Sequence, residues 1–234
     1  MRADLLYGAF FTILKAVPRT LFIALIVMAS AIVLGVFLAF LRMKRVKIIS
    51  PLIGLLVGYT RGTPMIVQLF IVYYSLPYGI AYMANRFFAA DIKAFDVPGL
   101  VTIYVTYIIC QAGYQCEVIR SALASVEHGQ MEGCYSVGMT GGQAMMRIIF
   151  PQALAIAIPS FFTHYMSTVK LMSLAFTLQV IDIMAAARLY TSLTERYTES
   201  YIAAAVIYWL IGLGLTFVFG KWESVSKRML GSVG

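Results

Sequence analysis

The stretch of sequence that decides the fold is residues 21–40, LFIALIVMASAIVLGVFLAF. It contains no charged side chain, and a helix of this length, at about 1.5 Å per residue, reaches about 30 Å, the thickness of a membrane's hydrocarbon core. Four cations follow at once: Arg42, Lys44, Arg45 and Lys47. Because cytoplasmic loops of membrane proteins are enriched in Lys and Arg, we predict that this loop is cytoplasmic and that the N-terminus lies outside.

The composition of the whole chain also indicates a lipid environment. Of the 234 residues, 61% are hydrophobic and 12% are charged, whereas soluble domains carry about 25% charged residues. In a soluble protein the net charge of +8 would indicate nucleic acid as a partner. Here the basic residues flank apolar runs, which the positive-inside rule explains without nucleic acid. We therefore expect an all-α integral membrane protein.

Apolar runs recur along the chain, and they predict five crossings with a cytoplasmic C-terminus. The runs lie at residues 21–40, 48–85, 98–116, 148–169 and 201–220. Residues 1–16 carry apolar side chains at roughly helical spacing and are expected to form an N-terminal interfacial helix. Residues 17–234 are expected to form one transmembrane domain.

The second apolar run, residues 48–85, is the least regular. As one continuous helix it would reach about 57 Å, too long for one crossing, while two crossings and a turn would need about 43 residues. We predict one crossing that breaks near Gly62 and Pro64, with a separate outer segment after Pro77. Further along, residues 171–181 are apolar but too short to span, which predicts a half-helix or an interfacial segment, and residues 191–200 are predicted to be polar and external.

The sequence contains no pattern typical of an enzyme. It has no P-loop, no HExxH motif and no Ser, His and Asp set that could be placed together, so we predict no catalytic residue and no metal site. His164 is expected to be a packed helix residue rather than a proton relay. The three cysteines have no metal-like spacing and are expected to be small packing residues: Cys110, Cys116 and Cys134.

The most informative polar segment is the predicted cytoplasmic loop at residues 125–147. Apolar side chains stand among polar ones there without the length to span, a pattern typical of short amphipathic helices, and Gly138 permits a sharp turn between them. A protein partner that buries the apolar face explains this pattern, and a loop lying on lipid headgroups explains it equally well. The apolar residues are Val126, Met131, Tyr135, Val137 and Met139.

This loop resembles the EAA loop of bacterial ABC importer permeases, in which Glu-Ala-Ala, three residues, Gly and nine residues precede Ile-x-Leu-Pro. The spacing agrees throughout, although Gly133, Cys134 and Phe150 replace the two alanines and the leucine. In that family the loop is a coupling helix that fits a groove on the ATPase. The resemblance therefore implies that coupling falls to Glu132, Gly133, Cys134, Gly138, Ile148 and Pro151.

Further motifs narrow the resemblance to the permeases for histidine, glutamate, glutamine, arginine and cystine. Residues 59–70, YTRGTPMIVQLF, are similar to that family's Arg-Gly-Thr-Pro-x-x-x-Gln-Leu segment. The segments 117–122, 129–130, 151–154 and 170–174 follow the family's order, so the likeness covers nearly the whole chain. The family's Lys-Asp-Thr-Ser is replaced by Lys170-Leu171-Met172-Ser173, so any role of that acid is lost here.

What the resemblance implies is a five-span type I ABC importer permease fold in a bacterial inner membrane. Two such subunits, identical or paired with a relative, form the translocation path. Two ATPase subunits hold ATP and Mg, while this chain has no cofactor and is no enzyme, and an external binding protein delivers a polar amino acid. Closure of the ATPases turns the path outward and hydrolysis reopens it inward, a shift between two populated states.

Several residues then acquire candidate roles. Arg61 is costly inside a bilayer unless it faces a partner or a cavity, so it either tethers the broken helix or contacts substrate. Thr63 and Gln68 are candidates to line the same path. Glu117 and Arg120 lie one helical turn apart and are expected to pair locally rather than to gate.

Two more residues in the later crossings also have a structural and a gating alternative. Lys170 either snorkels to the outer interface or attracts anionic groups there. Pro159 frees a backbone carbonyl and so either bends the helix or exposes polar backbone to the path.

Two other functions compete with this interpretation. An ion-coupled secondary amino-acid transporter would need buried carboxylates in its crossings, and the predicted crossings contain none apart from Glu117 at an end. A membrane scaffold that merely recruits a cytoplasmic protein would have no use for Arg61. Residues 173–177, SLAFT, are similar to cystine-type permeases, which makes cystine a candidate substrate.

Overall fold

The computed structural model describes residues 3–44 and 46–231, and this part of the chain is helical without a strand, as predicted. Arg45 of the predicted cytoplasmic cluster lies outside the described residues. The helices are α1 (Ala3–Leu14), α2 (Val17–Met43), α3 (Ile49–Gly62), α4 (Met65–Phe88), α5 (Gly99–Ala124), α6 (His128–Ser136), α7 (Gly141–Ala144), α8 (Phe150–Leu171), α9 (Ile183–Thr194) and α10 (Tyr197–Gly231). Short turns of 3-10 or π-helix lie at Ala94–Asp96, Met145–Ile149 and Met172–Leu178.

Four helical stretches are long and apolar enough to cross a membrane: Leu6–Met43, Met65–Phe88, Gly141–Leu178 and Tyr197–Lys221. Helix α5 is also long, with 26 residues. It is less apolar because it carries buried polar side chains, Thr102, Thr106, Gln111 and Gln115. Such side chains are tolerated at membrane depth when they face the interior of a bundle instead of lipid. Together with α5, these stretches correspond to the five predicted crossings.

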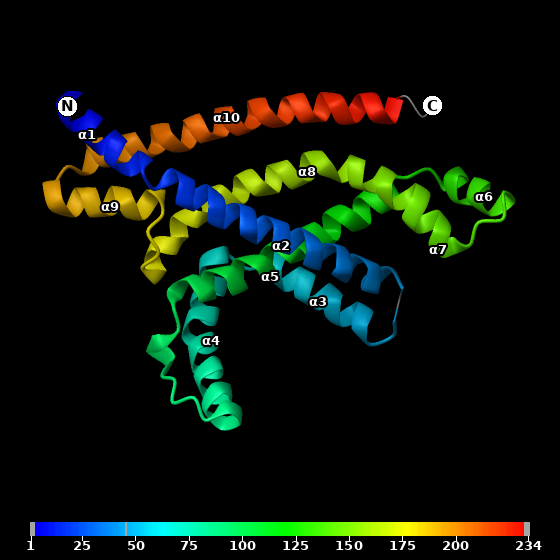
Figure 1. Cartoon of the computed structure of the whole chain (residues 1–234), viewed down its shortest axis with the longest axis horizontal. Helices are drawn as coiled ribbons and strands as arrows, with labels where there is room; N and C mark the ends of the chain where they lie inside the picture. The colour runs from blue at the N-terminus through cyan, green and yellow to red at the C-terminus, as the bar shows by residue number, and fades with distance from the viewer. Residues whose placement is uncertain (1–2, 45, 232–234) are drawn as a thin grey trace.

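Helix α5 is the centre of the molecule. It packs along α2 and also against α3, α4 and α8 (Figure 1). The close approach of α2 and α5 depends on Gly35, because a Cβ there would lie 2.5 Å from Cβ of Gln115. Small residues at such crossings let two backbones pack closely in membranes.

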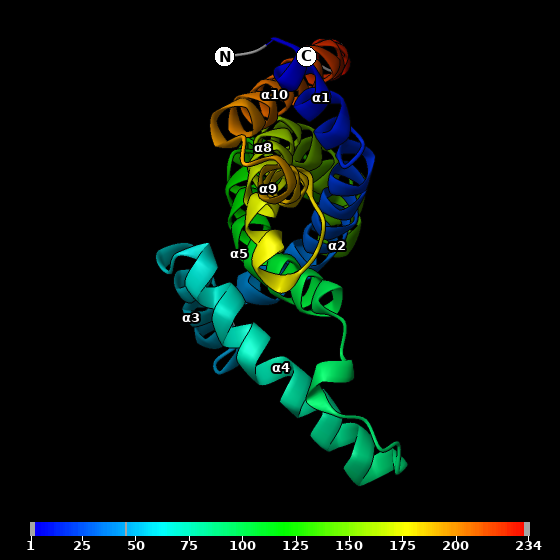
Figure 2. The same ribbon diagram turned by 90° about the vertical axis from the view of Figure 1, so that its left-hand side faces the viewer.

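Two helices, α3 and α4, stand where the sequence predicts a single crossing with a break in it. Helix α3 ends at Gly62 because Thr63 precedes Pro64, and the residue before a proline is pushed out of the helical region. The predicted break is therefore confirmed. The separate outer segment after Pro77 is wrong: α4 continues through this proline to Phe88. Seen from the end of the bundle, α4 leaves the other helices and projects to one side (Figure 2).

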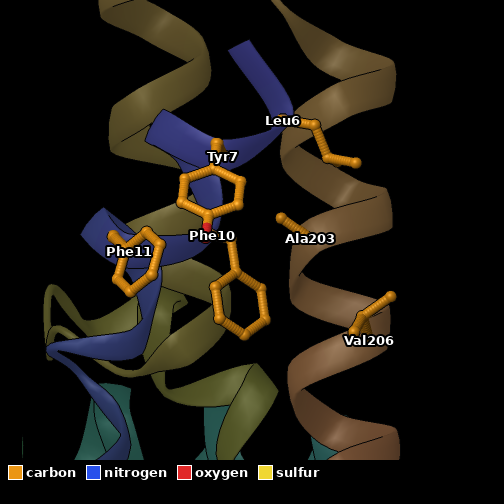
Figure 3. Close-up of a pocket in the computed structure, with 6 residues that line it drawn as sticks. All are labelled: Leu6, Tyr7, Phe10, Phe11, Ala203 and Val206. Carbon is orange, nitrogen blue, oxygen red and sulfur yellow. The ribbon is translucent and has the colours of Figure 1, made fainter. Parts of the chain in front are cut away.

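The N-terminal helix α1 forms as predicted and rests against protein. It packs on α9 and α10, burying Ala9 and Ile13. Aromatic side chains of α1 and the small side chains of α10 line a shallow apolar pocket between the two helices (Figure 3). Tyr7 and Phe11 remain 69% and 49% exposed, which suits the interfacial position expected for this helix.

After α8 the chain contains a helix that the sequence did not predict. The short segment expected at 171–181, a half-helix or an interfacial segment, forms a 3-10 turn at Met172–Leu178, and the helix α9, which the sequence analysis did not predict, follows it. The segment 191–200, expected to be polar and external, contains the end of α9 and the start of α10, with only Glu195 and Arg196 between the two helices. The run AAAR within α9 consists of strong helix formers, and a capping aspartate fixes its start.

Candidate functional site

The side chain of Gln68 bridges the break between α3 and α4. Its amide nitrogen donates to the carbonyl oxygens of Thr60 at 3.1 Å and Thr63 at 2.7 Å. Its Oε1 accepts from Sγ of Cys110 on α5 at 2.6 Å. Carbonyls freed by a helix break must be satisfied internally at membrane depth. Gln68 meets that need and anchors the break to α5.

Thr60 fixes the same break from the other side. It is 2% exposed and lies against Gly113 of α5, where no room is left for a Cβ. Of the three predicted path residues, Gln68 is only 3% exposed, Thr63 is half-buried and Arg61 is exposed. In this conformation Gln68 therefore serves the backbone of the break, and Arg61 is the open group beside it.

Arg61 starts a row of polar groups that crosses three helices. Its guanidinium carbon lies 6.0 Å from the centre of the Tyr114 ring on α5. The Tyr114 ring in turn lies 5.4 Å from the ring of His164 on α8. His164 is half-buried, as the prediction of a packed residue requires. A guanidinium, a phenol and an imidazole thus offer hydrogen-bonding groups along one face between α3, α5 and α8.

The polar loop forms the two short helices that the sequence predicts, α6 and α7. They lie beyond the ends of α5 and α8, at the opposite end of the molecule from α1 and α9 (Figure 1). Gly138 ends α6 with a φ of 80°, and the amides of Gly138 and Met139 donate to the carbonyls of Tyr135 and Cys134, both at 3.0 Å. This pair of bonds is a Schellman motif, which needs a left-handed residue and so favours glycine. The predicted sharp turn at Gly138 is confirmed.

The loop leaves apolar side chains uncovered at its tip. Tyr135 is 54% and Val137 is 76% exposed, while Cys134 is buried as a packing residue. Glu132 and Gly133 are exposed on α6. Among the other residues matched to the EAA pattern, Ile148 is half-buried and Pro151 is exposed, where the loop runs into α8.

A charged cluster closes the same end of α5. Glu117 accepts from Nε of Arg120 at 2.8 Å, which is the local pair expected from their spacing. Its other oxygen pairs with Nη1 of Arg42 at the end of α2. The sequence analysis missed Arg42 as a partner because 75 positions separate it from Glu117. One carboxylate thus ties α2 to α5 where both helices end.

Comparison with known proteins decides the family. The family model for the binding-protein-dependent transport system inner membrane component matches residues 31–222. The chain belongs to this family of ABC transporter permeases. It is 35% identical to the probable amino-acid permease YxeN of Bacillus subtilis, over 97% of this chain and 95% of that protein. It is 33% identical to the L-cystine transport system permease TcyL of the same organism, over 93% and 88%.

Solved structures agree with this assignment. The permease superposes on the structure titled an amino acid ABC transporter with histidines with a TM-score of 0.80 and 25% identity, over 96% of this chain and 99% of the other. The MetNI methionine transporter shares the fold, with a TM-score of 0.72 at 14% identity. The resemblance stated from the motifs is thus confirmed at the level of an amino-acid ABC transporter permease.

The two remaining predicted residues of the permease lie in α8. Pro159 is inside the helix, and its carbonyl accepts from the hydroxyl of Thr163 at 3.1 Å. Lys170 is exposed in the last turn of α8, at the end that carries α9.

The sequence analysis missed Asp182, a buried carboxylate of the permease. It is 2% exposed and caps α9, accepting from the amides of Met184 at 3.1 Å and Ala185 at 2.8 Å. Tyr208 of α10 donates to it at 3.4 Å. Burial raises the pKa of the Asp182 carboxyl, against the lowering effect of the amide and phenol donors. An aspartate directly before a run of helix formers is the signal that predicts such a cap.

Proposed function

We propose that this permease is the membrane-spanning subunit of an importer that moves a polar amino acid into the cytoplasm, with residues 125–147 as the coupling loop to an ATPase. Its amino-acid ABC permease family supports this function. The observation that carries the coupling role is the turn at Gly138, which stands where the EAA pattern has its glycine. That turn leaves Tyr135 and Val137 uncovered, and their apolar surface suits a groove on a partner.

The remaining parts of the proposal follow from this role. Two ATPase subunits with ATP and Mg bind at the end that carries α6 and α7, and that end is cytoplasmic together with the C-terminus. A second permease, identical or related, completes the path, and an external binding protein delivers substrate at the end that carries α1 and α9. Glu132 is exposed on α6 and is available to pair with a cation of the ATPase.

Arg61 is the proposed contact for the substrate carboxylate. It is exposed beside the α3–α4 break, and Tyr114 and His164 extend its polar row toward α8. A guanidinium binds a carboxylate in a bidentate manner. Thr63 contributes the partly open end of the same break, and Gln68 keeps the break in shape. Ion-coupled transport is not favoured, because the chain belongs to the family of ABC transporter permeases.

Cystine is the first substrate to test. Residues 173–177 are similar to cystine-type permeases, and the relatives at about 30% identity include two permeases named for L-cystine transport. Uptake of a panel of labelled amino acids by vesicles that contain the assembled transporter and its binding protein would identify the substrate. Uptake of a basic or amide amino acid, without uptake of cystine, would reject cystine as the substrate. It would still support the import of a polar amino acid.

The coupling role is tested at Gly138. Gly138→Val places a β-branched residue at a φ of 80°, which such side chains rarely adopt. We expect uptake to be lost while the variant still inserts into the membrane. The matched control is Gly79→Val, since Gly79 lies on α4 outside the coupling loop, with open space around it and no left-handed backbone, and this variant should keep its uptake. Normal uptake by Gly138→Val, with ATPase co-purified as in the wild type, would reject this assignment of the loop.

A further inference from the structure

A basic pocket lies where α2, α3 and α5 meet at the end of the apolar spans. It has a volume of about 430 Å³. Arg42 and Arg120 supply two cations and Ser50 a hydroxyl, while the rest of the lining is apolar or small: Met43, Leu123 and Ala124. The pocket thus combines a polar, positively charged side with an apolar side.

The charges of the pocket do not cancel. Both arginines share the single carboxylate of Glu117, which leaves one positive charge in excess. The side chain of Arg120 is 45% exposed and uses only Nε for Glu117. Its two terminal nitrogens donate no hydrogen bond to any of the described residues. An anion that enters the pocket therefore finds a guanidinium with free donors, held in place through its Nε.

The walls of the pocket are fixed by the protein. Ser50 at the start of α3 donates to the carbonyl oxygen of Arg42 at 3.2 Å, which joins the two ends of the α2–α3 connection. Arg42 is held by Glu117 on α5. The pocket is therefore built by three elements and does not depend on one mobile side chain.

The position of the pocket selects the kind of anion. Helix α2 carries no charged side chain from Thr20 to Leu41, and the exposed Lys44 and Lys47 follow shortly after. The pocket consequently lies at the depth where acyl chains give way to headgroups. Basic pockets between membrane helices bind the phosphates of anionic lipids. Met43 and Leu123 offer an apolar wall that a free phosphate ion would not use, but an acyl chain would.

We propose that this pocket binds the phosphodiester of an anionic glycerophospholipid, with Arg120 and Arg42 on the phosphate and Met43 and Leu123 against the acyl chains. The bound lipid fills the joint between α2, α3 and α5, and none of the residues that line the pocket belongs to the Arg61 row or to residues 125–147. The proposal is independent of the function proposed above, and loss of the coupling assignment would leave it standing.

Lipid binding to the assembled transporter, counted by native mass spectrometry, tests this site. With the wild type we expect phosphatidylglycerol to bind more tightly than phosphatidylcholine. Arg120→Gln should weaken phosphatidylglycerol binding about fivefold, the effect of one cation near a membrane surface. The matched control is Arg86→Gln, which removes an exposed cation from the last turn of α4, away from the pocket, and should leave this binding unchanged.

Three results would overturn the proposal. One is equal binding of phosphatidylglycerol and phosphatidylcholine by the wild type, a measurement that needs no variant to fold. Another is an equal effect of the Arg120 and Arg86 substitutions. The third is displacement of the lipid by inorganic phosphate at matching concentration, which would show that the site selects free phosphate. Because the assembled transporter includes the ATPase subunits, the expected difference between the two variants would also show that the pocket faces lipid and not the ATPase.

Discussion

The side-chain amide of Gln68 donates to the carbonyl oxygen of Thr63 at 2.7 Å, across the proline that separates α3 from α4. This contact turns a helix break into a defined joint, because the carbonyl that has lost its helical partner gains a side-chain donor. Arg61 is carried on the last turn of α3, immediately before the joint. Its position beside Tyr114 therefore depends on the geometry that Gln68 maintains.

Gln68→Leu is expected to lower the stability of the permease. The substitution keeps an apolar side chain of similar size but leaves the carbonyls of Thr60 and Thr63 without the donor. An unsatisfied buried group costs about 1–3 kcal/mol, so the melting temperature in detergent should fall by several degrees. Gln111→Leu is the matched control, since Gln111 is equally buried and its Oε1 has no hydrogen-bond partner within the described residues. A wild-type melting temperature for Gln68→Leu would contradict the structural role.

Arg61→Ala separates substrate contact from tethering. If Arg61 binds the substrate carboxylate, uptake should fall about tenfold or more, the effect of losing a hydrogen bond to a charged group, while the ATPase still co-purifies. Arg61→Lys keeps the charge without the planar fork and should retain part of the activity. Failure of Arg61→Ala to assemble with its partners, despite normal insertion, would assign Arg61 to tethering.

Local features were predictable from the sequence, and distant contacts were not. The break before Pro64, the turn at Gly138 and the Glu117–Arg120 pair each depend on residues within a few positions of one another. The pairing of Arg42 with Glu117 depends on how α2 and α5 cross, which no local pattern records. The burial of Gln68 is of the same kind, because α5 covers it.

Helix α9 was not predicted for a different reason. Apolar run length is a good guide for helices that cross lipid, but α9 has only 12 residues and mixes alanine with polar side chains. Such a segment is neither a span nor an evident loop. Pro77 misled the prediction for a related reason: proline ends helices in water, whereas in a membrane protein neighbouring groups allow the helix to continue through it.

Asp182 gives a prediction that depends on pH. Burial raises the pKa of its carboxyl in the folded permease, so the folded state holds the proton more tightly than the unfolded state, in which the pKa is about 3.9. As pH rises from the pKa of the unfolded state to the higher pKa of the folded state, the free energy of unfolding must fall, because the folded state binds more protons in that interval. Asp182→Asn keeps an oxygen acceptor for the cap and removes the charge. A plot of its melting temperature against pH, measured from pH 4 to pH 8, should therefore lose the part of the slope that the carboxyl contributes.

Asp182→Ala removes the cap and should cost about 1 kcal/mol of unfolding free energy at every pH. An unchanged slope in Asp182→Asn would show that the carboxyl does not titrate differently on folding, and a stable Asp182→Ala would show that the cap does not hold α9 in place.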